Sequence, residues 1–593
     1  MRKVLLLSSM IFILIFICTA FVSAKTTHIT LLTVGDEEGQ SFGGTADAFL
    51  EIKQGSGRIF LDSFPLTKLD TQISTRYANE IACNYLDMDC SGYDFFYTIR
   101  AGSTIVGGPS ASASLTVLTI AALKNIELNE KVIMTGTINS GGSIGPVGGV
   151  IKKAKVAEEK GFEKVLVPMF TIMVPEIVIN ENVNNTNTTV IYVENETNET
   201  IEDSNLTIEI IKVRNIDEAM SYFTDTPLNQ EEKEIQVPEQ YTSIMKKVSE
   251  KLCERAFDLD KKTILTDKDE LNKTAQHLQN INTSFEEQDY YSAASYCFTL
   301  SVLLRKANLR NIEMNEPSQI PVLFNTTKNA IDKFDQSLEL INLTTLSELE
   351  TYIIVKERLL DAEKTLDEIA DNISTDQLGY AIERYYSAMY WSEFFKMKTQ
   401  KVELDPEYLE SACFKKLSEA EERINYAALY VPLTMISARD TLKQSRVFSD
   451  QGNYKMCMFM ASFAKAEANL LLSTIAISKE QAVELAEEKL NSAKKLISKE
   501  ADRGFFPIIG YSYYQYSGTL KENEDIVSSL IFSEYSLELS NLEMYFPKKE
   551  FRLPRINFNS VYFYGSALLL GLAVGLFIGA RSKKSVKKSK NKK

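Results

Sequence analysis

The sequence predicts an α/β domain over residues 27–225, an all-α helical domain of hairpins over residues 238–546, and a C-terminal transmembrane helix over residues 561–580. Three observations indicate this order. Strand-like and helix-like apolar patterns alternate through the first domain, whereas only helical spacing continues after it. An uncharged apolar run then precedes a basic end. A chain of 593 residues is long enough for three or four such units.

The α/β domain combines short strands with amphipathic and buried helices. The apolar helix pattern at residues 110–123 covers nearly every face, so we expect that helix to be buried. An Asn/Thr-rich insertion at residues 178–207 is typical of an exposed loop that carries glycans. Strand patterns lie at residues 28–34, 46–52, 58–61, 95–99, 132–138 and 164–167, and the other helix patterns lie at residues 68–85 and 149–160.

The helical domain contains segments that resemble one another. Residues 289–297 are similar to residues 452–457 and the Ala-rich helix that follows them, and residues 380–395 and 525–545 look like weaker copies. Stacked antiparallel hairpins bury such aromatic and alanine stripes. Generic amphipathic helices without true repetition are the alternative interpretation.

The two ends predict the topology. Arg2 and Lys3 precede an apolar run over residues 4–22, and small residues follow, so residues 1–24 are typical of a signal peptide. An uncleaved N-terminal anchor is the alternative, because the run is long for a signal core. Residues 581–593 form a basic tail that stays in the cytoplasm, which predicts a single-pass protein of the cell membrane with the bulk of the chain outside. A homo-oligomer is expected through the first domain or through Gly571, Gly575 and Gly579 on one face of the predicted transmembrane helix.

Cysteines and glycosylation sequons agree with export. Asn-X-Ser/Thr sequons are typical of surface loops in exported glycoproteins. The even number of cysteines left after the signal peptide permits disulfides, and the spacing favours Cys83 with Cys90, Cys253 with Cys297, and Cys413 with Cys457. The sequons lie at Asn184, Asn187, Asn195, Asn198, Asn205, Asn272, Asn282, Asn325, Asn342 and Asn372.

Composition excludes several classes of function. A net charge of −15 argues against nucleic acid as a partner, since phosphate binding needs clustered Lys and Arg. His28 and His277 are the only histidines, so a Ser-His-Asp triad and a His-rich metal site are poorly supported. The sequence contains no G-x-x-x-x-G-K-[ST] phosphate loop, and we expect no cofactor and no metal.

Two segments carry residues suited to peptide hydrolysis. Gly107-Gly108-Pro109-Ser110-Ala111-Ser112 forms a tight turn into a helix, where unpaired N–H groups and the helix dipole stabilise an oxyanion. A serine at such a position is also a common helix cap. Lys153 has apolar neighbours that allow partial burial, and burial lowers the pKa of a lysine so that it can act as a base. A lysine on a helix is, however, usually solvated.

Together the two segments resemble the proteolytic domain of the Lon family. The resemblance rests on residues 108–111 (Gly-Pro-Ser-Ala), residues 134–136 (Met-Thr-Gly) and residues 142–149 (Gly-Ser-Ile-Gly-Pro-Val-Gly-Gly). It implies a Lon-type α/β fold, Ser110 as nucleophile, Lys153 as general base and then acid, and Thr135 as the hydroxyl that orients the lysine. Gly108, Pro109 and Ala111 support the nucleophile. Lys152 is the adjacent alternative, but the family spacing selects Lys153.

The sequence departs from the Lon pattern at a few places. Gly107 stands where many Lon proteins have an acidic residue, and Ser112 stands where they have glycine. The resemblance covers about residues 27–225, and the ATPase module of Lon is missing. The chain therefore looks like the exported, ATPase-free Lon-like proteins of archaea.

We expect an ATP-independent, membrane-anchored serine endopeptidase that cleaves peptides or unfolded protein segments outside the cytoplasm. A catalytically inactive surface scaffold or receptor with the same fold is one alternative. A protein that processes only its own chain is another.

Overall fold

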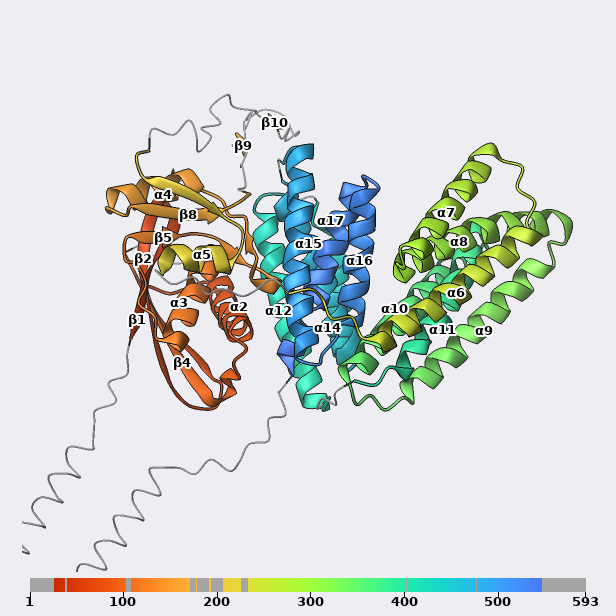
Figure 1. Ribbon diagram of the computed structural model, residues 1–593, viewed down its shortest axis with the longest axis horizontal. Coiled ribbons are helices and arrows are strands. Elements are labelled where there is room, and N and C mark those ends of the chain that lie inside the picture. The colour runs from red at the N-terminus through yellow and green to blue at the C-terminus, as the bar shows by residue number, and fades with distance from the viewer. Residues whose placement is uncertain are drawn as a thin grey trace, which may run out of the picture. The chain divides into compact units, whose positions relative to one another are not determined.

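The computed structural model in Figure 1 describes a mixed sheet with helices on both faces, followed by a long series of helices. The parts of the chain that it describes are residues 26–37, 40–102, 108–170, 177–178, 191–192, 206–224, 233–399, 404–432, 434–475 and 477–546. The predicted signal peptide over residues 1–24, most of the 178–207 insertion and the Gly571, Gly575 and Gly579 face lie outside them.

Seven strands form the main sheet, in the order β11-β8-β5-β1-β2-β4-β3. β1 pairs antiparallel with β2 and parallel with β5, and the strands from β5 to β11 continue parallel. At the other edge, β4 pairs antiparallel with β2 and parallel with β3. The strands are β1 (Thr27–Glu37), β2 (Gln40–Gln54), β3 (Ile59–Phe64), β4 (Tyr93–Ala101), β5 (Val132–Met134), β8 (Lys164–Pro168) and β11 (Glu209–Val213).

Helices cover both faces of this sheet. Leu31 and Leu32 are adjacent in β1 and point to opposite faces, so each belongs to a different apolar core. The core that contains Leu31 packs against α2 (Leu69–Tyr85), α3 (Ser112–Lys124) and α5 (Ile216–Phe223), and the core that contains Leu32 packs against α4 (Val150–Glu159). The prediction that the helix near residues 110–123 is buried is confirmed, because every residue from Ser112 to Ala121 is buried.

The strand expected at residues 132–138 is interrupted, and the interruption matters for the site. β5 ends at Met134, and β6 (Thr137–Ile138) pairs instead with β7 (Ile144–Gly145) in a small separate sheet. Gly136 lies at the break, where an added Cβ would come within 2.5 Å of the Ile144 side chain. Thr135 therefore stands at the carboxyl end of a parallel strand. β9 (Ile177–Val178) and β10 (Ile191–Tyr192) form a further two-stranded pair.

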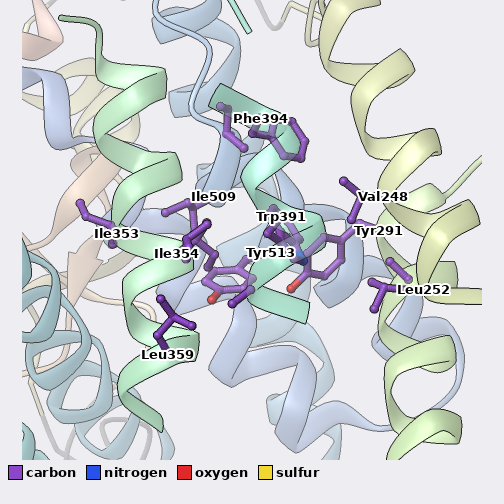
Figure 2. Close-up of a cluster of buried hydrophobic side chains, with 14 of the residues drawn as sticks. Val248, Leu252, Tyr291, Ile353, Ile354, Leu359, Trp391, Phe394, Ile509 and Tyr513 are labelled. Carbon is purple, nitrogen blue, oxygen red and sulfur yellow. The ribbon is translucent and has the colours of Figure 1, made fainter. Parts of the chain in front are cut away.

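The remainder of the described chain is helical and buries a large apolar core. Figure 2 shows part of this core, where Tyr291, Trp391 and Tyr513 meet aliphatic side chains of several helices. The helices are α6 (Glu239–Lys262), α7 (Lys268–Glu286), α8 (Tyr290–Asn315), α9 (Gln319–Glu339), α10 (Leu346–Glu368), α11 (Thr375–Trp391), α12 (Pro406–Ala428), α13 (Ile436–Asp450), α14 (Tyr454–Thr474), α15 (Lys479–Asp502), α16 (Ile508–Glu522) and α17 (Ile526–Leu539).

The two segments that resemble each other in sequence begin equivalent helices. Asp289 caps α8 and Asn453 caps α14, each by accepting a hydrogen bond from a backbone N–H of the first turn. A disulfide joins Cys253 of α6 to Cys297 of α8, and another joins Cys413 of α12 to Cys457 of α14. Both span 44 residues. The α6–α8 and α12–α14 triplets thus share a cap, a spacing and a covalent link.

The predicted fold class needs one correction. Among the residues that the structure describes, no helix combines the length and apolar character needed to cross a membrane. Long helices such as α6 and α15 fail because charged residues recur along them and occupy their exposed faces. The C-terminal transmembrane helix at residues 561–580 therefore has no support in this fold, and that stretch lies outside the described residues. What remains is an α/β domain followed by an all-helical part.

Candidate active site

A glycine turn presents Ser110 at the start of a helix. Gly108 has a φ of 98°, a backbone conformation that favours glycine, and its N–H donates to Asp70 Oδ2 at 3.0 Å. Pro109 and Ala111 bound a single 3₁₀ turn that contains Ser110 and leads directly into α3. Ser110 is half-buried, so its side chain is accessible at the amino end of a buried helix.

Ser112 holds this turn against the small β6–β7 sheet. Its hydroxyl donates to the carbonyl of Pro109 at 2.7 Å and accepts from the N–H of Ile138 at 2.9 Å. A glycine at this position could make neither side-chain bond. The departure from the Lon pattern at Ser112 therefore adds support to the turn, while Gly107 lies outside the described residues.

Thr135 connects the serine turn to the lysine. Its hydroxyl donates to the backbone carbonyl of Ser110 at 3.2 Å, and the N–H of Gly136 donates to the same carbonyl at 2.9 Å. Lys153 Nζ donates to Thr135 Oγ1 at 2.9 Å. The three predicted residues are thus brought together around one buried hydroxyl. Among the hydrogen bonds of the described residues, none joins Lys153 Nζ directly to Ser110 Oγ.

Lys153 is buried on α4 with 2% of its surface exposed, whereas Lys152 is exposed. Burial lowers the pKa of Lys153 from its usual value near 10.5 to about 7. Gly149, which has a φ of 68°, precedes the helix and sets the direction of its first turn. A substantial fraction of the amine is therefore neutral near pH 7, which suits a general base.

The helical part of the chain borders this site through α12. Arg423 donates to Thr137 Oγ1 at 3.1 Å and to the carbonyl of Ile138 at 3.2 Å, two and three residues after Thr135. An added Cβ on Gly148 would lie 2.5 Å from the hydroxyl of Tyr430. The segments on both sides of the Thr135–Lys153 contact are therefore held by α12 and the turn that follows it.

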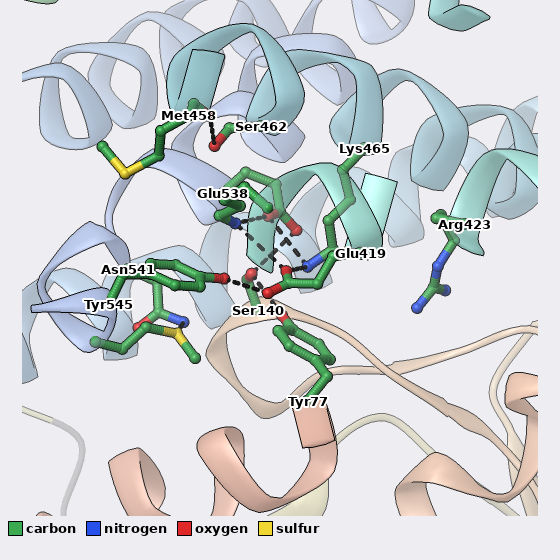
Figure 3. Close-up of polar contacts among 12 residues, drawn as sticks. Tyr77, Ser140, Glu419, Arg423, Met458, Ser462, Lys465, Glu538, Asn541 and Tyr545 are labelled. Atoms are coloured by element: carbon green, nitrogen blue, oxygen red, sulfur yellow. Dashed lines mark hydrogen bonds and ion pairs between the residues drawn. The ribbon is translucent and has the colours of Figure 1, made fainter. Parts of the chain in front are cut away.

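A buried ionic cluster extends this contact, and Figure 3 shows it between the helices and the α/β part. Glu538 accepts from Lys416 at 2.7 Å and from the hydroxyl of Ser140 at 3.0 Å. Lys465 lies 3.8 Å above the ring of Tyr77 and pairs with Glu419 at 2.8 Å. Burial alone would raise the pKa of Glu538, but the two lysines lower it to about 2, so the carboxylate stays charged.

Sequence reasoning missed this contribution of the helices. Along α12 the charged residues Lys416, Glu419, Glu422 and Arg423 recur at spacings of three and four, which is typical of a solvated helix face. In the structure all four are buried. The sequence held one sign of this burial. The residues between these four charged positions include few large apolar side chains, so α12 lacks the wide apolar face of a helix that is solvated on its charged side.

Comparisons with known proteins bear on the α/β domain. Residues 75–197 match the Lon protease (S16) C-terminal proteolytic domain. The Archaeal Lon protease of Methanothermobacter thermautotrophicus is 30% identical over 138 residues, which is 23% of this chain and 21% of that protein. The Archaeal Lon protease of Thermoplasma acidophilum is 44% identical over 63 residues, 11% of this chain and 10% of that protein.

A bacterial relative gives a similar result. Lon protease 2 of Bacillus subtilis is 36% identical over 83 residues, 14% of this chain and 15% of that protein. The chain therefore spans about a fifth or less of the length of these curated relatives. The match includes the Ser110, Thr135 and Lys153 region, confirms the resemblance to the Lon proteolytic domain, and indicates a serine peptidase family.

Proposed function

We propose that this chain, which carries a Lon-type proteolytic domain, is a serine endopeptidase that uses Ser110 as nucleophile and Lys153 as base. Ser110 Oγ attacks a peptide carbonyl, and neutral Lys153 accepts the hydroxyl proton. The resulting ammonium returns a proton to the leaving amine, and water then hydrolyses the ester on Ser110. Backbone N–H groups at the start of α3 stabilise the oxyanion.

The observation that carries this proposal is the buried amine of Lys153 on the Thr135 hydroxyl. Thr135 is itself bonded to the backbone carbonyl of Ser110, so the amine and the serine turn share one hydroxyl as a contact. Burial supplies the depressed pKa that the chemistry requires. A solvated lysine at this position would be protonated and could not accept a proton near pH 7.

We further propose that the enzyme needs no ATP and acts outside the cytoplasm on peptides or unfolded segments. The absence of a phosphate-loop motif supports the first point. The disulfides Cys83–Cys90, Cys253–Cys297 and Cys413–Cys457 support the second, because such bonds persist in oxidising compartments. The asparagines of the five sequons within the described helices and loops are all exposed, namely Asn272, Asn282, Asn325, Asn342 and Asn372.

Hydrolysis of an unstructured, fluorophore-labelled casein by the purified full chain tests this proposal. Ser110→Ala and Lys153→Met should each abolish cleavage, while Lys152→Met, an adjacent lysine change on the exposed side of α4, should preserve it. Addition or removal of ATP should change nothing. Cleavage that survives Ser110→Ala, or that depends on Lys152 rather than Lys153, would refute the assignment. Cleavage confined to the chain's own termini would instead support the self-processing alternative.

A further inference from the structure

A cavity of about 930 Å³ lies between α2 and α12, where the α/β domain meets the helices. Asp70, Arg76 and Glu80 line it from α2, and Glu410, Phe414 and Glu422 line it from α12. The volume is within the range of small-molecule and side-chain binding sites in proteins. The Lon-type domain supplies only one wall, so the helical part of the chain creates this space.

The lining is strongly acidic. Seven acidic and three basic side chains border the cavity. Some of these charges are already compensated: Lys415 pairs with Glu80 at 2.6 Å, and Glu421 pairs with Arg446 at 2.7 Å. Glu419 is also compensated, by Lys465 at 2.8 Å. A smaller excess of carboxylates remains, and it faces a space bordered on two sides by protein, where electrostatic interactions are stronger than in bulk water.

Among the lining residues of the described chain, Glu422 is the one with a buried side-chain oxygen that has no hydrogen-bond partner. It is 7% exposed, and its Oε1 has no hydrogen-bond partner in the structure. Its other oxygen lies 3.9 Å from Arg423 Nε, which is too long for a hydrogen bond. A buried carboxylate oxygen that lacks a hydrogen-bond donor is costly, so Glu422, whose other oxygen forms only a long ion pair with Arg423, is a place where a cation can bind.

The cavity adjoins the nucleophile turn through Asp70. Asp70 lines the cavity and also accepts the N–H of Gly108, two residues before Ser110. Glu422 and Asp70 are close enough to interact: burial raises the pKa of Glu422 to about 7, Arg423 and Lys465 oppose this rise, and the negative charge of Asp70 adds to it. A ligand cation placed between them would favour the ionised form of Glu422.

We propose that this cavity binds a lysine or arginine side chain of the peptide substrate, with Glu422 as its main partner, and so directs cleavage next to basic residues. The inference rests on the proposed peptidase function. The apolar side chains of Ile73 and Phe414 in the same lining cover the aliphatic part of such a residue. No group of three or more potential metal-ligating side chains in the described chain could hold a metal ion, which favours an organic cation.

Binding tests the inference independently of catalysis. Two labelled, unstructured peptides that differ only in one lysine or norleucine are titrated into the full chain carrying Ser110→Ala, and fluorescence anisotropy gives Kd. The lysine peptide should bind about tenfold more tightly, which corresponds to one charge-assisted contact. Adding Glu422→Gln should remove most of that difference. Ser418→Lys introduces a cation at a half-buried lining position without changing the buried core. This variant should also weaken binding of the lysine peptide.

Glu487→Gln is the matched control, because it makes the same charge change at an exposed position on α15 that does not line the cavity. It should leave both Kd values unchanged. Equal Kd values for the two peptides would overturn the inference. An equal loss of affinity for the lysine peptide in Glu487→Gln and Glu422→Gln would also overturn it, since that result would reflect non-specific attraction to a chain of net charge −15.

Cleavage by the chain with native Ser110 separates this inference from the proposed function. The ratio of kcat/KM for the lysine and norleucine peptides should be about ten and should fall toward one in Glu422→Gln. Cleavage without preference would overturn the cavity assignment and leave the peptidase intact. Cleavage that persists after Ser110→Ala would overturn the peptidase mechanism, while the binding measurements would still decide whether the cavity selects a cation.

Discussion

At the scale of single residues, the burial of the Lys153 amine lowers the stability of the fold and gives the amine a low pKa. The amine of Lys153 is buried beside Thr135, where it has lost its hydration. Because its pKa is about 7 in the folded chain and near 10.5 in the unfolded chain, the unfolded state binds an extra proton between these values. Folding stability contributed by this position is therefore greatest above about pH 10.5, falls as the pH decreases, and levels off below about pH 7.

Lys153→Met should accordingly stabilise the protein at neutral pH. Relative to this variant, the native chain should lose on the order of 4–5 kcal/mol of unfolding free energy between pH 10.5 and pH 7. Thermal unfolding of both proteins over this range checks the expectation. The gap in unfolding temperature should widen as the pH falls, whereas a gap that is constant with pH would show that the amine is not buried in this way.

We propose that Thr135 positions the amine of Lys153, which donates to its hydroxyl. Thr135→Val keeps the shape of the side chain but removes the acceptor of Lys153 and the donor to Ser110. We expect kcat to fall roughly 100-fold with little change in KM, as misplacement of a catalytic group does. Thr135→Ser should restore most of the rate, because it restores the hydroxyl. A Val variant with normal kcat would exclude this role.

Ser110, Thr135 and Lys153 could be predicted from sequence, because three short motifs resemble the Lon proteolytic domain in order and spacing. Local patterns alone did not single them out, since a helix-capping serine and a solvated lysine are the ordinary interpretations. Glu422 and Arg423 could not be predicted, because their burial depends on packing between α12 and the α/β domain, where Arg423 contacts residues 285 and 286 positions earlier in the sequence. Periodicity reports which face of a helix is charged but not what covers that face.

At the scale of elements, α12 is the helix outside the α/β domain that contacts the candidate active site. Arg423 donates hydrogen bonds to the Thr137 hydroxyl and to the carbonyl of Ile138, so it holds the strand that follows Thr135. The sequence predicted α12 as one of many helices, and the order of strands and helices in the α/β part was also anticipated. The break after β5 was not anticipated, because it depends on the close approach of Gly136 and Ile144.

Arg423→Met should reduce both stability and activity. Two buried acceptors lose their donor, which costs roughly 1–3 kcal/mol each at a buried site. Arg446→Met on α13 is the control, because Arg446 is half exposed and pairs only with Glu421 in the described contacts, so the change should cost no more than about 0.5 kcal/mol. Chemical denaturation and casein cleavage measure the two effects. Similar losses in the two variants would argue against a special role for Arg423.

At the scale of the whole molecule, two disulfides with the same spacing allow effects on stability to be distinguished from effects on activity. Cys253–Cys297 and Cys413–Cys457 each close a loop of 44 residues. Only the second fastens α12, the helix whose Arg423 contacts Thr137 and Ile138. The cysteine spacing suggested these pairs, but it could not indicate that one of them joins α14 to the helix that carries Arg423.

Replacing either pair by serine should destabilise the chain by about 4 kcal/mol, since the two loops have equal closure entropy. Activity should respond differently. At a temperature where both variants remain folded, loss of Cys413–Cys457 should lower kcat/KM, and loss of Cys253–Cys297 should leave it near the native value. Equal activities would mean that α12 keeps its position without the disulfide. Thermal unfolding and casein cleavage provide the two readouts.

The pH dependence of kcat/KM tests the central claim, that a neutral Lys153 activates Ser110, most directly. For an unstructured peptide without titrating groups near pH 7, kcat/KM should rise with pH and reach half its maximum near pH 7, where Lys153 loses its proton. Lys153→Arg, which stays protonated throughout, should be inactive at every pH. A profile that is flat between pH 6 and pH 8, or an active Lys153→Arg enzyme, would contradict the account.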